Sequence, residues 1–102
     1  MYKKYVTAED FTSYDDFYQN FAIKTPANFN FAYDVVEEIA TKTPDKLALV
    51  WCNDKGDERT FTFKELEENV NRATNLFVGL GIKKGDAVML ILKRRYEYWF
   101  NL

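Results

Sequence analysis

Aromatic residues near the start of the chain recur with a helical period. They stand at positions i, i+3, i+4 and i+7, as Tyr14, Phe17, Tyr18 and Phe21. This spacing predicts a helix with one aromatic face, and Ser13 is a suitable N-cap for it. The stretch 23–29 contains a proline and predicts an extended connector.

A second helical pattern follows Asn30, which is a good N-cap. Its apolar residues form two adjacent stripes, Phe31, Val35 and Ile39 in one and Ala32, Val36 and Ala40 in the other. The helix is predicted to end at Thr43, because the residue before a proline is disfavoured in helical geometry.

The pattern then becomes strand-like. Residues 47–52 are a compact apolar run, and residues 59–63 alternate polar and aromatic side chains. The short polar loop between them contains Gly56, so a β-hairpin is the simplest interpretation. Its three acidic residues lack the ligand spacing of a calcium loop and indicate a solvated hairpin tip rather than a metal site.

The next transition carries the clearest local signals. Thr62 and Glu65 have the spacing of a capping box at the start of a helix. An apolar stripe then continues along that helix through Leu66, Val70, Ala73, Phe77 and Leu80. Gly81 and Ile82 predict a glycine C-cap. Residues 87–92, AVMLIL, predict a strand buried on both faces, which completes a βαβ unit with a parallel pair.

These elements predict an α/β fold. It comprises N-terminal helices, a β-hairpin, one βαβ unit and, from Tyr96, the start of a further helix. Length supports the same view, because 102 residues allow one domain with a modest core. The pattern is that of an incomplete piece of a larger α/β domain.

Composition and charge narrow the classes of function. The net charge of −2 supplies no field that would attract nucleic acid or an anionic membrane. Lys93, Arg94 and Arg95 form a basic run beside aromatic residues, which leaves nucleic-acid binding as a minor alternative. The single Cys52 fits a reducing compartment and, beside Val50 and Trp51, is expected to be a buried strand thiol.

Apart from the basic run, the chain offers no candidate motif for chemistry. It contains no histidine, which removes the Ser-His and Cys-His nucleophile pairs and histidine metal sites. It also contains no P-loop, Cys-x-x-Cys, HExxH or G-x-S-x-G motif. The acidic pairs 15–16 and 37–38 are adjacent and point in different directions on a helix. We therefore predict no catalytic, cofactor-binding or metal-binding residue within residues 1–102.

Three stretches in order carry a resemblance to a known family. They are the opening "NFNFAYDVVEEIA", the Phe-Thr-Phe-Lys-Glu-Leu entry into the long helix, and the turn Leu-Gly-Ile-Lys-Lys-Gly-Asp before the apolar run. With the strand "LVWCN", they resemble the start of the AMP-forming acyl-CoA synthetases of the adenylate-forming superfamily, and in particular the medium-chain branch. The resemblance covers about residues 28–102.

The resemblance implies a parent enzyme that joins a carboxylate to coenzyme A through an acyl-adenylate, with ATP and Mg²⁺ as cofactors. The phosphate loop, nucleotide-binding motifs and catalytic lysine of such enzymes have no counterpart in these residues. The chain is then an N-terminal fragment of the large domain, with residues 1–29 as a helical extension and connector and residues 30–102 as its first helix, hairpin and βαβ unit. The parent is expected to be an acid-thiol ligase, and the chain alone is expected to be inactive.

The alternative interpretation is a free-standing interaction or oligomerisation module with an aromatic-rich surface. The partners expected are the remainder of the parent enzyme and, for the isolated chain, a second copy of itself, with no nucleic acid and no membrane. The N-terminus has no signal-peptide pattern, and no stretch approaches the length needed to cross a bilayer. The sequence therefore predicts a cytoplasmic protein.

Overall fold

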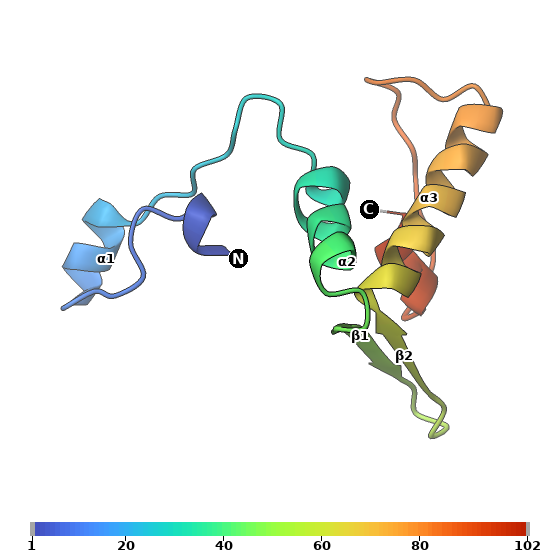
Figure 1. Cartoon of the computed structure of the whole chain (residues 1–102), viewed down its shortest axis with the longest axis horizontal. Coiled ribbons are helices and arrows are strands. Elements are labelled where there is room, and N and C mark those ends of the chain that lie inside the picture. The colour runs from blue at the N-terminus through green and yellow to red at the C-terminus, as the bar shows by residue number, and fades with distance from the viewer. Residues whose placement is uncertain (1, 102) are drawn as a thin grey trace.

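The computed structural model describes residues 2–101 and contains three α-helices, one two-stranded sheet and short segments of other helix types (Figure 1). The α-helices are α1 (Tyr14–Asn20), α2 (Glu38–Lys42) and α3 (Phe63–Gly79). The strands are β1 (Leu47–Cys52) and β2 (Glu58–Thr62). A π-helical stretch, η2 (Ala32–Glu37), leads directly into α2, and 3₁₀ turns form η1 (Tyr2–Tyr5) and η3 (Tyr96–Phe100).

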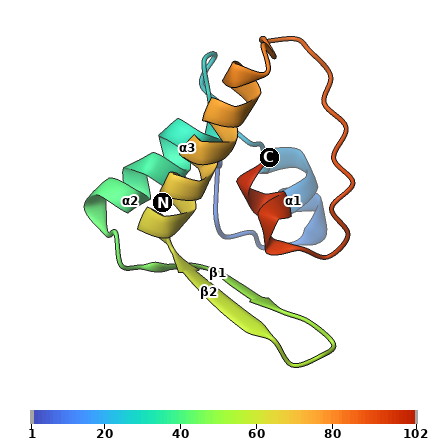
Figure 2. The ribbon, with the colours of Figure 1, turned by 90° about the vertical axis from the view of Figure 1, so that its right-hand side faces the viewer.

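The second half of the chain builds the packed part of the molecule. Helix α2 with η2 lies beside α3, and the hairpin projects from the end at which α3 begins (Figures 1 and 2). Helix α1 lies apart from these elements, at the other side of an extended connector (Figure 1). Among the helices of residues 2–101, none combines the length and the apolar character needed to cross a bilayer.

Strands β1 and β2 form the predicted antiparallel hairpin. Leu49 lies opposite Phe61 and Trp51 opposite Arg59, with an irregularity between Leu47 and Leu49. The α/β fold class and the hairpin are therefore confirmed.

The parallel strand of the predicted βαβ unit is not formed. Within residues 2–101 the only sheet has the order β1–β2, and residues 87–92 are assigned to no strand. The physical reason is their position: after α3 the chain runs back in an open arc that stays clear of that helix in Figure 2, whereas the hairpin lies beyond the end at which α3 begins (Figures 1 and 2). An apolar run predicts a strand only where another strand lies alongside to complete its hydrogen bonds.

Both predicted ends of α3 are confirmed. At the start, the Thr62 hydroxyl accepts from the Glu65 backbone N–H at 3.2 Å, and the Glu65 carboxylate accepts from the Thr62 N–H at 2.8 Å. At the end, Gly81 has φ +80°. The Ile82 N–H donates to the Phe77 carbonyl at 3.1 Å and the Gly81 N–H to the Val78 carbonyl at 3.0 Å, which is the Schellman pattern.

The core is small and lies between η2, α2, β2 and η3. Its buried residues are Val35, Val36, Ile39, Ala40, Phe61 and Phe100. The stripes predicted for residues 31–40 therefore face the core, except for Phe31, which is exposed. Asn30 caps this helix as predicted, accepting from the Ala32 N–H at 3.0 Å.

Two predicted apolar faces are less covered than their spacing suggests. No residue of α3 is buried; its stripe is half-buried and Leu80 is exposed. On α1, Phe17 and Phe21 pack on Phe11, but Tyr14 and Tyr18 are exposed. The hydroxyl groups of the two tyrosines can remain in water, so they need no buried partner.

The N-terminal segment is attached to the packed part by a few polar contacts. The Tyr5 hydroxyl donates to the Asp34 carbonyl at 3.2 Å, and the Glu38 carboxylate bridges Lys4 and Lys42. The division into residues 1–29 and residues 30–102 stays a prediction.

We expect the replacement Thr62→Ala to lower the free energy of unfolding by about 1 kcal/mol, because it leaves a backbone N–H at the start of α3 without an acceptor. Thr62→Ser keeps the hydroxyl and serves as the control. Urea unfolding followed by far-UV circular dichroism measures the difference, and equal midpoints for Thr62→Ala and Thr62→Ser would contradict the role of the cap.

A second prediction concerns Glu38, whose pKa is lowered to about 2 by hydrogen bonds from Lys4 and Lys42. Because the pKa in the folded chain lies below the ordinary value of 4.5, the stabilisation is present above that value and is lost as the pH falls through about 2. Titration of the Glu38 carboxyl carbon by NMR should show this low midpoint. Lys42→Gln should raise it and Lys24→Gln should leave it unchanged; an unchanged midpoint in Lys42→Gln would refute the pairing.

Candidate functional site

A wide apolar groove lies in the packed part of the molecule. Its volume is about 850 Å³, and it lies between η2, β1, α3 and η3. The lining is mainly apolar and comprises Asn30, Phe31, Ala32, Val35, Val36, Ala48, Leu49, Phe63, Leu66, Val70, Ala73, Thr74, Phe77, Trp99, Phe100 and Asn101. Such a surface binds other apolar surface rather than a charged ligand.

The helical spacing of α3 explains one wall of this groove. Leu66, Val70, Ala73 and Phe77 recur on one face of the helix, and all four line the groove while remaining half-buried. The apolar stripe predicted for α3 is thus formed. It lines an open groove and is only partly covered by other side chains of the described residues. The stripe itself was predictable, whereas the lack of a cover over it was not.

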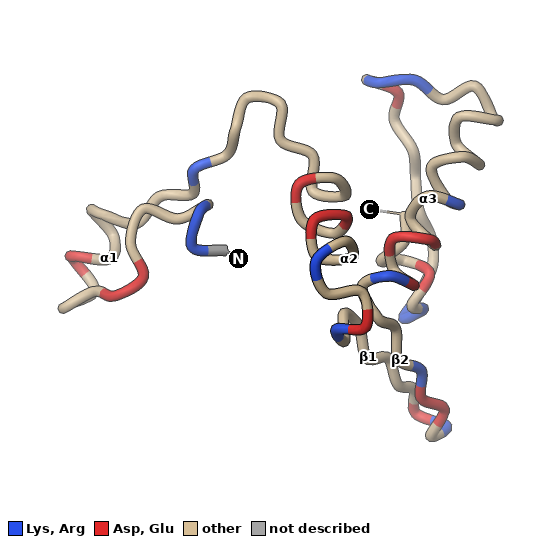
Figure 3. The backbone as a smooth tube through the Cα atoms, in the orientation of Figure 1, with Lys and Arg blue, Asp and Glu red and all other residues tan. Residues whose placement is uncertain are grey.

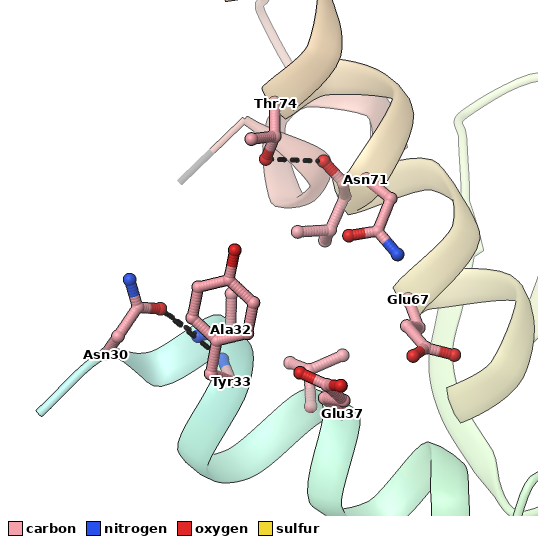
Figure 4. A pocket seen from close by; sticks show the side chains of 9 residues that line it. Asn30, Ala32, Tyr33, Glu37, Glu67, Asn71 and Thr74 are labelled. Atoms are coloured by element: carbon pink, nitrogen blue, oxygen red, sulfur yellow. Dashed lines mark hydrogen bonds between the residues drawn. The ribbon is translucent and has the colours of Figure 1, made fainter. Parts of the chain in front are cut away.

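A smaller pocket of about 150 Å³ adjoins the groove between η2 and α3 (Figure 4). Tyr33, Glu37, Glu67 and Asn71 give it a polar rim. The Asn30 side chain at its edge is used as a helix cap, and the Glu67 carboxylate accepts from Lys64 at 2.9 Å. These polar groups have structural partners or face solvent, and the lining contains no pair of nucleophile and base.

A third feature is the contact that fixes η3 to the hairpin. The Arg59 guanidinium donates to the Tyr96 hydroxyl at 2.8 Å and lies 5.1 Å from the centre of the Tyr96 ring. The Trp51 indole N–H donates to the Arg94 carbonyl at 2.8 Å, and the Trp51 and Tyr96 rings meet edge to face. The Phe61 ring packs against the rings of Tyr96 and Phe100 and completes the cluster. We call these five side chains, Trp51, Arg59, Phe61, Tyr96 and Phe100, the hairpin clasp.

The hairpin clasp accounts for part of the basic run. Arg94 contributes its backbone carbonyl, and Arg95 pairs with Glu97 at 3.0 Å and 2.5 Å. Glu97 raises the pKa of Arg95 by this hydrogen bond and keeps the guanidinium charged. The other lysine and arginine residues are scattered along the chain, with none in α1 or β1 (Figure 3). The basic run therefore helps to hold the start of η3 against Trp51 of the hairpin. Its sequence alone did not indicate this role.

Two further residues of chemical interest are placed by the structure. Cys52 is exposed at the end of β1, so the prediction of a buried thiol is wrong; the outer face of the hairpin has no layer packed on it. At the hairpin tip, Asn53 donates to Asp57 at 2.7 Å. Within residues 2–101 no group of three His, Cys, Asp or Glu side chains is arranged to hold a metal ion.

The part of the sequence that forms the hairpin and α3 matches a recognised protein family. The AMP-binding enzyme family matches residues 36–100, which is more than half of the chain. The chain belongs to the AMP-binding enzyme family. The predicted resemblance to the AMP-forming acyl-CoA synthetases is confirmed at this level.

Several curated relatives are similar to the chain over most of its length. The mitochondrial acyl-coenzyme A synthetase ACSM2A of Homo sapiens is 42% identical over 82 residues, covering 74% of this chain and 14% of the relative. The mitochondrial acyl-coenzyme A synthetase ACSM3 of Homo sapiens is 34% identical over 99 residues, covering 91% of this chain and 17% of the relative. The mitochondrial ACSM5 of Rattus norvegicus is 37% identical over 83 residues. The chain spans less than a fifth of the length of these relatives.

We expect the apolar groove to bind a neutral dye such as Nile red and to increase its fluorescence. Val70→Asp should reduce this signal several-fold, because Val70 lines the groove and a carboxylate there opposes apolar binding. Val78→Asp is the matched control, since Val78 lies on the same helix but is exposed outside the groove. An equal loss in both variants would show that the dye reports unfolding or another surface.

Proposed function

We propose that this chain is a structural segment from the N-terminal part of an AMP-forming acyl-CoA ligase. The parent enzyme converts a carboxylate, ATP and coenzyme A to acyl-CoA, AMP and pyrophosphate. In this proposal the segment supplies the first helix, the hairpin and α3 of the large domain, and performs none of the chemistry itself.

The observation that carries the proposal is the family match over residues 36–100. This range begins in η2 and ends in η3, so it includes the hairpin clasp and the part of the groove lining that lies between Val36 and Phe100. The relatives named acyl-coenzyme A synthetases support the ligase as the parent activity.

The uneven burial of the chain supports a structural role. The half-buried stripe of α3 and the apolar groove offer a surface that the remainder of a parent enzyme would cover. Burial of apolar area of this kind is the main favourable term in the association of protein parts. The remainder of the parent is therefore the partner that we propose for the groove.

We propose no site for ATP, Mg²⁺ or coenzyme A among the described residues. The sequence contains no phosphate loop, and residues 2–101 hold no cluster of potential metal ligands. The polar rim of the small pocket is acidic at Glu37 and Glu67, which opposes binding of a phosphate. We accordingly assign these cofactors to other parts of the parent enzyme and derive no catalytic step here.

Cytoplasmic localisation stays a prediction, and the relatives carry the word mitochondrial in their names. The acyl substrate of the parent is left open, because no residue of this chain is assigned to the acyl site.

The proposal predicts that the 102-residue chain alone does not catalyse carboxylate-dependent exchange of pyrophosphate into ATP. As the positive test, the chain should replace the corresponding segment of human ACSM2A and leave a folded chimera that still forms acyl-CoA. A chimera with Phe61→Asp, which places a charge in the hairpin clasp, is the control and should lose both stability and activity.

Two outcomes would contradict the proposal. Exchange activity in the purified 102-residue chain would show that it carries an active site. A chimera that does not fold, although the exchanged boundaries match those of the alignment, would show that the chain does not serve as the equivalent segment.

A further inference from the structure

Residues 87–92 form an extended apolar run, and its last residue, Leu92, accepts a hydrogen bond from the Arg95 N–H at 3.2 Å. Met89 is 84% exposed and Ile91 is 83% exposed. None of the backbone N–H groups from Ala87 to Ile91 donates to another backbone group in the described chain. A solvated strand with free hydrogen-bonding groups on both edges is a ready template for pairing with another chain.

The composition of this segment favours β-pairing. It consists of six uncharged apolar residues, AVMLIL, with no glycine and no proline. Segments of this length and character have a strong tendency to pair when they are exposed. We therefore call residues 87–92 the donor segment, because they can add as a strand to the free edge of a sheet.

Strand β1 is an edge strand with the composition of a central strand. Its sequence, LALVWC, is apolar on both faces, which is typical of strands that have a parallel neighbour on each side. In the two-stranded sheet β1 pairs only with β2, so its other edge has no strand beside it. Val50 and Cys52 on its outer face are exposed.

The charges at the two strands fix the direction of pairing. The donor segment is followed by the basic residues Lys93 to Arg95, and β1 is followed by a hairpin tip in which Asp54, Asp57 and Glu58 outnumber the single Lys55. Parallel pairing places the basic residues against the acidic tip. Pairing of two donor segments with each other would bring basic residues together at both ends, because Lys83 and Lys84 precede the segment.

The donor segment is joined to α3 by a connector that contains Gly85 and to the hairpin clasp by Lys93. Gly85 before it has φ +98°, and Lys93 after it has φ +29°. Glycine adopts such angles without steric cost and leaves room for the connector to rearrange. The hairpin clasp can meanwhile keep η3 on its own hairpin.

We propose that two copies of this chain associate by β-strand addition, with residues 87–92 of one copy pairing in parallel along the free edge of β1 in the other. Two such pairs form reciprocally in a closed dimer. This inference concerns the 102-residue chain itself and does not rest on the proposed function.

Sedimentation equilibrium over a series of protein concentrations tests the association. We expect a monomer–dimer equilibrium in the unmodified chain. Ile91→Lys should raise the dissociation constant roughly tenfold or more, equivalent to about 1.4 kcal/mol, because it places a charge in the paired segment. The side chain of Ile91 is exposed in the monomer, so this variant should fold normally.

Val78→Lys is the matched control, since it adds the same charge at an exposed position of α3 outside the segment and should leave the equilibrium unchanged. A strictly monomeric unmodified chain would overturn the proposal. Equal weakening in the two variants would assign the association to general apolar contact and would overturn it as well.

A cross-link identifies the acceptor edge. In the variant Ile91→Cys, mild oxidation should give a dimer joined between Cys52 and the new thiol, identified by mass spectrometry of the linked peptides. A dimer joined mainly between two new thiols would show that donor segments pair with each other. Salt provides an independent readout: added salt should weaken pairing of a basic flank with an acidic tip, whereas it should strengthen pairing of two basic flanks.

Discussion

The direct junction between β2 and α3 is the constraint on which the packed part of the molecule depends. Strand β2 ends at Thr62 and α3 begins at Phe63, so no connecting loop separates the two elements. The reciprocal hydrogen bonds of Thr62 and Glu65 fix the direction in which the helix leaves the strand. That direction places the apolar stripe of α3 across from η2 and thereby creates the groove.

The hairpin clasp fixes the position of η3 on the hairpin, near the C-terminal end of the described residues. Arg59 lies over the faces of Phe61 and Tyr96 and also donates to the Tyr96 hydroxyl, so that one side chain holds two rings and an oxygen in place. A guanidinium group can do this because it is planar and remains weakly hydrated. The clasp also explains why Phe100, near the end of the described chain, is buried although the residues before it are exposed.

Local signals in the sequence predicted local structure well. The capping box, the Schellman glycine and the hairpin depend on residues close together in the chain, and all three are confirmed. The strand predicted at 87–92 depended instead on a neighbour distant in sequence, which apolar composition alone cannot supply. The same limitation applies to the site. The stripe of α3 was predictable from its spacing, but the groove and the contact of Arg59 with Tyr96 arise from elements whose relative placement no motif encodes.

The π-helical stretch at Ala32–Glu37 bears on how the family can vary in length. Each of its hydrogen-bonded turns closes around one residue more than an α-helical turn. The Asn30 cap before it and the break at Thr43 after it fix both ends of the helix, so the extra residue is absorbed between them. The π-helical stretch thus holds one residue more than an α-helix would hold between the same two ends. Deletion of one residue from this stretch would allow a continuous α-helix between the same cap and the same break.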